Sequence, residues 1–388
     1  MKIFEKILST VIVIGILICS LSFPAFAESE AESVGASMKF DCRSAILMEA
    51  STGAVLYEMN ADEALPPASV TKVMTLLLVM EAIEAGKISL EDTVTASEHA
   101  CSMGGSQIYL EVGEQMTVEE LIKSVVIASA NDAALALAEH IAGSEEVFVE
   151  MMNRRAAELG LTSTHFENTN GLDDTVQNHV CSARDIAVMS RELIKHKKIT
   201  EFSSIWMDTI RNGEFGLTNT NRLVRFYKGA TGLKTGSTSK AKFCITATAE
   251  RDGLSLICVI MAAPTRDIRN AAAVSLLDWG FANYGVYRAE SGEADPVKVI
   301  GGAVSRCRVY YPEFSYVCNK GDISKIKITV DIPEKISAPI SRGDKIGRII
   351  YSIDGKEIGG VDILSNDSVD RISFFQVMLK LLSKMAMC

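Results

Sequence analysis

Residues 66–85 read PPASVTKVMTLLLVMEAIEA and set the architecture of the domain around them. After the two prolines, the pattern predicts a helix from Val70 to Ala85 that ends before Gly86, a residue type common just past helix ends. Apolar side chains lie on nearly every side of this helix, so it must be buried in a large domain. Ser69 and Lys72 are three residues apart, which places both side chains on one face at the helix start.

A serine and a lysine in this arrangement can act as a nucleophile and its base. Burial lowers the pKa of a lysine, so its neutral amine can accept the serine proton, and a helix start favours the negative charge that develops during attack. The spacing alone is weak evidence. It recurs at Ser237, Ser239 and Ser324, and Ser69 could simply cap the helix.

Two further motifs strengthen this interpretation. Ser129-Ala130-Asn131 interrupts the apolar run from Leu121 to Ala138, and Lys234-Thr235-Gly236 precedes a predicted strand. Taken singly, these could be turn residues and a surface lysine. In the order SxxK, SxN and KTG, with SAN as the middle motif here, they match the signature of class A β-lactamases and penicillin-binding proteins.

The chain from about Asp41 to Tyr284 resembles the catalytic domain of low-molecular-mass penicillin-binding proteins that act as D-alanyl-D-alanine carboxypeptidases. Further stretches that carry the resemblance are Pro67-Ala68-Ser69, Gly104-Gly105-Ser106 before Gly113-Glu114, Asn170-Gly171-Leu172, Ser182-Ala183-Arg184-Asp185 and Ala263-Pro264-Thr265-Arg266. A hairpin at 44–57, helices at 118–141, 144–159, 183–196 and 268–283, and strands at 241–249 and 254–261 predict an α+β domain. The expected fold is a β-lactamase/transpeptidase-like domain, which combines an antiparallel sheet with helices. The strands from the two ends of the domain are expected to share this sheet.

The resemblance implies roles for the motif residues. Ser69 would attack the carbonyl between the two terminal D-alanines of a peptidoglycan stem peptide and form an acyl-enzyme, with Lys72 accepting its proton. Ser129 would relay a proton to the departing nitrogen. Asn131 would hold the peptide and orient Lys72. β-lactams would inhibit the enzyme by acylating the same serine.

The third motif would bind the substrate. Lys234 and Thr235, helped by Ser237 or Thr238, would bind the free carboxylate, and Gly236 would let the peptide lie along the strand edge. The backbone N–H groups of Ser69 and Ser237 would form the oxyanion hole. Arg266 is a further candidate for the carboxylate, with a solvated surface arginine as the alternative. His179 has no partner that the sequence can assign, and is interpreted as structural.

The ends of the chain predict export and membrane attachment. Lys2, Lys6, an apolar stretch and Ala25-Phe26-Ala27 indicate a signal peptide over 1–27, with an uncleaved anchor helix as the alternative. A linker (28–40), the catalytic domain (41–285) and an all-β domain (286–366) follow. Residues 367–388 form an amphipathic helix, which we expect to lie peripherally on the outer face of the cytoplasmic membrane; the alternative is a helix docked on the β domain.

Other chemistries lack their motifs. The net charge is −10 and basic residues form no long run, so nucleic acid is not expected as a partner. Neither phosphate-binding glycine loops nor CxxC or HExxH patterns occur, so we expect no nucleotide cofactor and no metal. No disulfide framework can be deduced from the scattered cysteines.

Two rival functions remain at the level of sequence. A serine β-lactamase would need a deacylating glutamate in an ExxLN pattern, which residues 166–174 lack, with Glu167 as the only nearby glutamate. A non-catalytic β-lactam sensor or cell-wall-binding protein would need a transmembrane link or would have lost a motif residue. Neither feature is seen, which favours the carboxypeptidase.

Overall fold

The computed structural model describes residues 38–174 and 176–385. The predicted signal peptide, the first part of the predicted linker and the last three residues lie outside this range. Among the described residues, no helix has both the length and the apolar character needed to cross a membrane.

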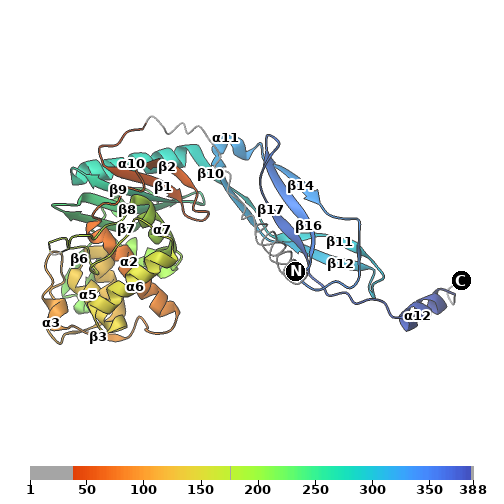
Figure 1. Cartoon of the computed structure of the whole chain (residues 1–388), viewed down its shortest axis with the longest axis horizontal. Coiled ribbons are helices and arrows are strands. Elements are labelled where there is room, and N and C mark those ends of the chain that lie inside the picture. Colours follow the sequence, from red (N-terminus) through yellow and green to blue (C-terminus); the bar gives the residue numbers. More distant parts are fainter. Residues whose placement is uncertain (1–37, 175, 386–388) are drawn as a thin grey trace, which may run out of the picture. The chain divides into compact units, whose positions relative to one another are not determined.

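A five-stranded antiparallel sheet is the centre of the larger domain (Figure 1). Its strand order is β2-β1-β9-β8-β7. Strand β1 from the start of the domain pairs with β9 from its end, which confirms the expectation that the terminal strands share one sheet. The strands are β1 (Ser44–Glu49), β2 (Val55–Met59), β7 (Ala230–Thr238), β8 (Lys242–Arg251) and β9 (Leu254–Ala263).

Helices cover both faces of this sheet: α10 (Arg266–Asn283) packs on β8 and β9, and α7 (Ala183–Leu193) packs on β1 and β9 from the other face (Figure 1). The remaining helices are α2 (Lys72–Glu84), α3 (Glu98–Cys101), α4 (Val118–Lys123), α5 (Asn131–Ala142), α6 (Glu145–Glu158), α8 (Lys197–Ser203) and α9 (Leu223–Phe226). Two small two-stranded sheets complete the domain: β3 (Thr93–Thr95) with β4 (Gln115–Thr117), and β5 (Met207–Ile210) with β6 (Phe215–Thr218). The α+β prediction is therefore confirmed, although the sequence analysis did not predict α8.

Helix α2 is buried as its composition requires. Every residue from Lys72 to Met80 is buried, and α2 packs against α5 and α7. The chain enters this helix through a 3-10 turn, η2 (Ala68–Thr71), which is a common way for a helix to begin. The α-helical part therefore starts two residues later than predicted.

The single helix predicted over 118–141 is wrong. Helix α4 passes into a π-helical turn, η3 (Ser124–Ala128), and the chain then breaks at Ser129, whose φ of 63° is left-handed. Helix α5 begins two residues later, at Asn131. Apolar residues continue on both sides of Ser129-Ala130-Asn131, so the pattern was also compatible with a single helix, and π-turns of this kind often accompany functional sites.

The second domain is all-β, as predicted. Its main sheet has the order β14-β16-β17-β12-β11-β15, and Asp354-Gly355 forms the turn between β16 and β17 with positive φ at both residues, as a type I′ hairpin requires. The strands are β10 (Tyr284–Ala289), β11 (Gly292–Ile300), β12 (Arg306–Tyr311), β13 (Phe314–Asn319), β14 (Lys327–Asp331), β15 (Lys335–Ser337), β16 (Lys345–Ile353) and β17 (Lys356–Ser365), with a short helix α11 (Lys320–Ile323). A last helix, α12 (Phe374–Met385), follows this domain.

Candidate active site

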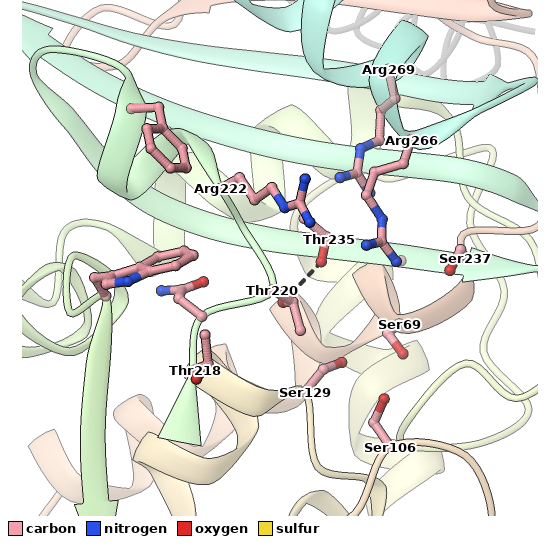
Figure 2. A pocket seen from close by; sticks show the side chains of 14 residues that line it. Ser69, Ser106, Ser129, Thr218, Thr220, Arg222, Thr235, Ser237, Arg266 and Arg269 are labelled. Atoms are coloured by element: carbon pink, nitrogen blue, oxygen red, sulfur yellow. Dashed lines mark hydrogen bonds between the residues drawn. The ribbon is translucent and has the colours of Figure 1, made fainter. Parts of the chain in front are cut away.

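The three sequence motifs meet at one cleft, although they are far apart in the chain. Ser69 comes from η2, Ser129 from the break before α5, and Thr235 and Ser237 from edge strand β7 (Figure 2). The KTG motif therefore lies within strand β7. The prediction that it precedes a strand is wrong. The cleft has a volume of about 560 Å³, within the range of small-ligand pockets.

Lys72 is fully buried beside Ser69. Its Nζ atom lies 3.0 Å from Ser69 Oγ, 2.5 Å from Asn131 Oδ1 and 2.9 Å from the carbonyl oxygen of Asn170. Burial holds the pKa of Lys72 well below its ordinary value; the charge of Lys234 lowers it further and that of Asp132 opposes this. A neutral amine can therefore face the serine hydroxyl.

Gly236 allows β7 to lie close to the start of η2. A Cβ atom at this position would lie 2.8 Å from the backbone nitrogen of Ser69 and 2.9 Å from the carbonyl oxygen of Pro67. Only glycine avoids these contacts without a shift of the strand. Beside the predicted role in binding the substrate along the strand, this glycine therefore also has a packing role against η2.

A second buried lysine, Lys234 of β7, contacts Ser129. Lys234 Nζ donates to Ser129 Oγ over 2.8 Å and to the carbonyl oxygen of Thr235 over 2.9 Å. Burial lowers the pKa of Lys234 to about 7, and the charge of Arg269 adds to this effect. Near neutral pH, this lysine can therefore exchange a proton with its surroundings at small cost.

Asn131 is held by the glycine-rich stretch 104–106. Its Nδ2 donates to the carbonyl oxygen of Gly104 over 2.7 Å, which leaves Oδ1 to accept from Lys72. A Cβ atom on Gly105 would lie 2.8 Å from the same Nδ2. The backbone of Gly104 and Gly105, which is not part of α5, therefore fixes the orientation of the Asn131 side-chain amide.

Family models match both domains of the chain. A model described as D-alanyl-D-alanine carboxypeptidase matches residues 29–265, and one described as penicillin-binding protein 5, C-terminal domain, matches residues 290–371. The chain belongs to the D-alanyl-D-alanine carboxypeptidase family. The resemblance seen in the sequence is thereby confirmed.

Relatives of this carboxypeptidase are similar along almost their full length. D-alanyl-D-alanine carboxypeptidase DacF of Bacillus subtilis is 41% identical over 378 residues, covering 95% of this chain and 96% of the relative. DacC of Escherichia coli is 33% identical, covering 92% and 90%. Among solved structures, penicillin binding protein 5 of Haemophilus influenzae has a TM-score of 0.74 at 31% identity, covering 86% of this chain and 99% of that one.

The cleft of this carboxypeptidase is lined by cations that the sequence analysis largely missed. Arg222, Arg266 and Arg269 lie along it with their guanidinium groups on the side of Thr235 (Figure 2). No carboxylate lines the cleft among the residues that the structure describes. Only Arg266 was predicted; Arg269 lies one helical turn further along α10, a spacing that could have suggested it.

Thr220 is a further member of the site without a sequence signal. Thr235 Oγ1 donates to Thr220 Oγ1 over 2.9 Å, and both hydroxyls line the cleft (Figure 2). Thr220 lies in the loop between β6 and α9, far from the three motifs in sequence. Only the packing of this loop against β7 brings it to the site.

His179 has a defined structural place in the carboxypeptidase. Its Nδ1 accepts from the backbone N–H of Glu167 over 3.0 Å, so its Nε2 carries the proton and donates to Thr71 Oγ1 over 2.7 Å. Thr71 Oγ1 in turn donates to the carbonyl oxygen of Ala68, the residue before Ser69. Burial lowers the pKa of His179 to about 4, so the ring is neutral at pH 7.

Proposed function

We propose that this protein removes the terminal D-alanine from peptidoglycan stem peptides through an acyl-enzyme on Ser69, with Lys72 as the base. One observation carries the assignment. The amine of Lys72 is fully buried 3.0 Å from Ser69 Oγ, and its pKa is lowered by that burial. A serine hydroxyl is a weak nucleophile unless a base of this kind takes its proton during attack.

Acylation follows from this arrangement. Ser69 Oγ bonds to the carbonyl carbon before the last D-alanine while its proton moves to Lys72. The backbone N–H groups of Ser69 and Ser237 stabilise the oxyanion. The C–N bond then breaks, and the nitrogen of the departing D-alanine takes a proton from Ser129, which recovers one from Lys234 at 2.8 Å. Water then hydrolyses the ester: its oxygen bonds to the acyl carbon, the proton it loses returns through Ser129 to Lys234, and Ser69 Oγ takes back the proton held by Lys72 as the C–O bond breaks.

The cationic end of the cleft supports recognition of the substrate's free carboxylate. Lys234, the Thr235 hydroxyl and Arg266 are the groups proposed to bind it, with Arg222 and Arg269 adding positive charge nearby. In the free protein, burial and the charge of Arg269 lower the pKa of Lys234 to about 7, which leaves it close to half-protonated near neutral pH. A bound carboxylate favours its charged form, so binding of substrate and protonation of this lysine support each other.

A serine β-lactamase is the nearest rival function, and the environment of Glu167 argues against it. The carboxylate of Glu167 accepts hydrogen bonds from the backbone N–H groups of Gln177 and Asn178, at 2.9 and 3.0 Å. Glu167 does not line the cleft. It is therefore not placed to activate a water molecule against the acyl group on Ser69, so we expect β-lactams to remain bound as slowly released covalent inhibitors.

We also propose that the protein works outside the cytoplasm, peripherally on the outer face of the membrane. Residues 1–27 have the features of an export signal. Helix α12 exposes several large apolar side chains, namely Phe374, Phe375, Val377, Met378 and Met385. An interfacial helix buries such side chains at the boundary between headgroups and acyl chains.

The direct test is release of D-alanine from a peptide ending in Lys-D-Ala-D-Ala by the chain from residue 28 onwards, solubilised in detergent. The wild-type chain should release D-alanine and become labelled by a fluorescent penicillin, and Ser69→Ala should do neither. Release that survives Ser69→Ala would overturn the mechanism. Rapid turnover of the penicillin label would favour the β-lactamase.

A further inference from the structure

We infer that Glu145 and Thr75 are positioning residues that aim the lone pair of Lys72 at Ser69 by holding the main-chain carbonyl of Asn170 in place. The inference rests on the roles proposed above for Ser69 and Lys72. Neither positioning residue lines the cleft. Their effect passes through a loop, residues 168–172, whose Asn170 carbonyl oxygen lies 2.9 Å from Lys72 Nζ.

The argument starts from the hydrogen-bonding capacity of an amine. Neutral Lys72 has two N–H donors and one lone pair, and it has three polar neighbours. Two of them, Asn131 Oδ1 and the Asn170 carbonyl oxygen, can only accept. They take the two N–H groups, so the lone pair has to face Ser69 Oγ, the one neighbour with a proton to give. Without the Asn170 carbonyl, the amine could rotate and turn an N–H toward the serine.

The Asn170 carbonyl is not fixed by regular secondary structure, because residues 168–172 form neither helix nor strand. Two anchors hold the preceding residue instead. Glu145 Oε1 accepts from both the backbone N–H and the Oγ1 of Thr169, over 3.0 and 2.8 Å. Thr75 Oγ1 donates to the carbonyl oxygen of Thr169 over 2.6 Å. Thr169 is therefore held at both of its main-chain polar groups.

The placement of the anchors suits this role. Thr75 is fully buried and lies three residues after Lys72, so α2 presents the base and the loop anchor on one face. Glu145 is in the first turn of α6, and its side chain is 16% exposed. Its two bonds to Thr169 are charge-assisted and therefore stronger than neutral ones. Its other carboxylate oxygen lies 3.7 Å from His99 Nε2, on the side away from the loop.

The test compares paired variants in the full chain. Glu145→Ala and Thr75→Val remove the anchors, whereas Glu145→Gln and Thr75→Ser keep the hydrogen-bonding oxygen. Glu146→Ala is the matched control, since it removes an exposed carboxylate from the same first helical turn. For each variant, the second-order rate constant of acylation by a fluorescent penicillin, the kcat and KM for D-alanine release, and the Tm are measured.

We expect Glu145→Ala and Thr75→Val to lower the acylation rate constant and kcat by about tenfold or more, since small displacements of a catalytic group have effects of this size. KM should stay within about twofold, because the carboxylate-binding groups are untouched. Glu145→Gln, Thr75→Ser and Glu146→Ala should remain close to the wild type. If Glu145→Ala is too unstable to purify, Glu145→Asp, shorter by one methylene, gives the same comparison with Glu145→Gln.

Two results would overturn the inference. In the first, Glu145→Ala and Thr75→Val lower Tm but leave the acylation rate and kcat unchanged, which makes the contacts purely structural. In the second, Glu145→Gln is as slow as Glu145→Ala, so that charge and not hydrogen bonding matters. Failure of the proposed function looks different, because the wild type would then release no D-alanine or Ser69→Ala would still be labelled.

Discussion

The Nζ atom of Lys234 lies 2.8 Å from Ser129 Oγ, and both side chains are buried beside the serine-lysine pair. Two buried lysines thus lie behind the serines of the cleft, each within hydrogen-bond distance of one of them, and Lys234 is one of the groups that lower the pKa of Lys72. A positive charge on Lys234 adds to the effect of burial in lowering the pKa of the base, and it is itself available for a substrate carboxylate. This coupling leads to the first two predictions.

The specificity constant should fall on the alkaline side of about pH 7. The pKa of Lys234 in the free protein is lowered to about 7, so the cation that binds the substrate carboxylate is lost as pH rises through this value. The measurement is kcat/KM for a D-Ala-D-Ala peptide across neutral pH. In Lys234→Arg the guanidinium stays charged, so the alkaline limb should disappear even if the absolute rate drops. A wild-type profile without an alkaline limb near neutral pH contradicts the prediction.

The contribution of Lys234 to stability should rise with pH above about 7. The pKa of Lys234 is about 7 when folded and near 10.4 in an unfolded chain, so between these values the unfolded state binds more protons and the free energy of unfolding increases with pH. The contribution is at most about 1.4 kcal/mol per pH unit. Urea unfolding at two pH values in this window should show a smaller increase for Lys234→Met than for wild type. Lys87→Met, at an exposed position, should keep the wild-type slope.

Gly236→Ala should slow acylation of Ser69. The added Cβ would lie 2.8 Å from the Ser69 backbone nitrogen, so β7 must move away from the nucleophile and from the oxyanion position. We expect the rate constant of penicillin acylation to fall by about tenfold or more. Gly216→Ala is the control, because a Cβ there has nothing within 4 Å and the backbone φ is not left-handed. An unchanged acylation rate in Gly236→Ala would show that the strand adapts without cost.

Membrane binding should depend on the apolar side of α12. Phe374 and Phe375 are 86% and 64% exposed, so Phe374→Glu combined with Phe375→Glu alters this surface without disturbing a core. The variant should lose binding to anionic lipid vesicles in a flotation assay while keeping its rate of D-alanine release. Val330→Glu, at an exposed apolar position of the β domain, serves as the control. Flotation of the double variant equal to wild type would contradict the anchor and favour a helix with another partner.

The sequence by itself determined the parts that depend on local spacing. Ser69 and Lys72 on one helical face, the hairpins with their turns, and the order of three motifs follow from periodicities of 3.6 and 2 and from turn chemistry. The periodicities were enough to predict the fold class and the sheet that joins both ends of the domain, whereas the family was predicted from the resemblance that the motifs carry. The amphipathic tail was visible for the same reason, although its role remains a proposal.

Only the tertiary structure decided how the site is supported. The break at Ser129 lies inside an apolar run that reads as one helix, and Thr220 and Arg222 come from a loop with no motif. The hydrogen bond from Lys72 to the Asn170 carbonyl involves a main-chain group. Every residue has such a group, so the identity of the side chain does not indicate this contact. Contacts of this kind depend on how segments that are distant in the sequence pack together, so they cannot be predicted from the spacing of residues.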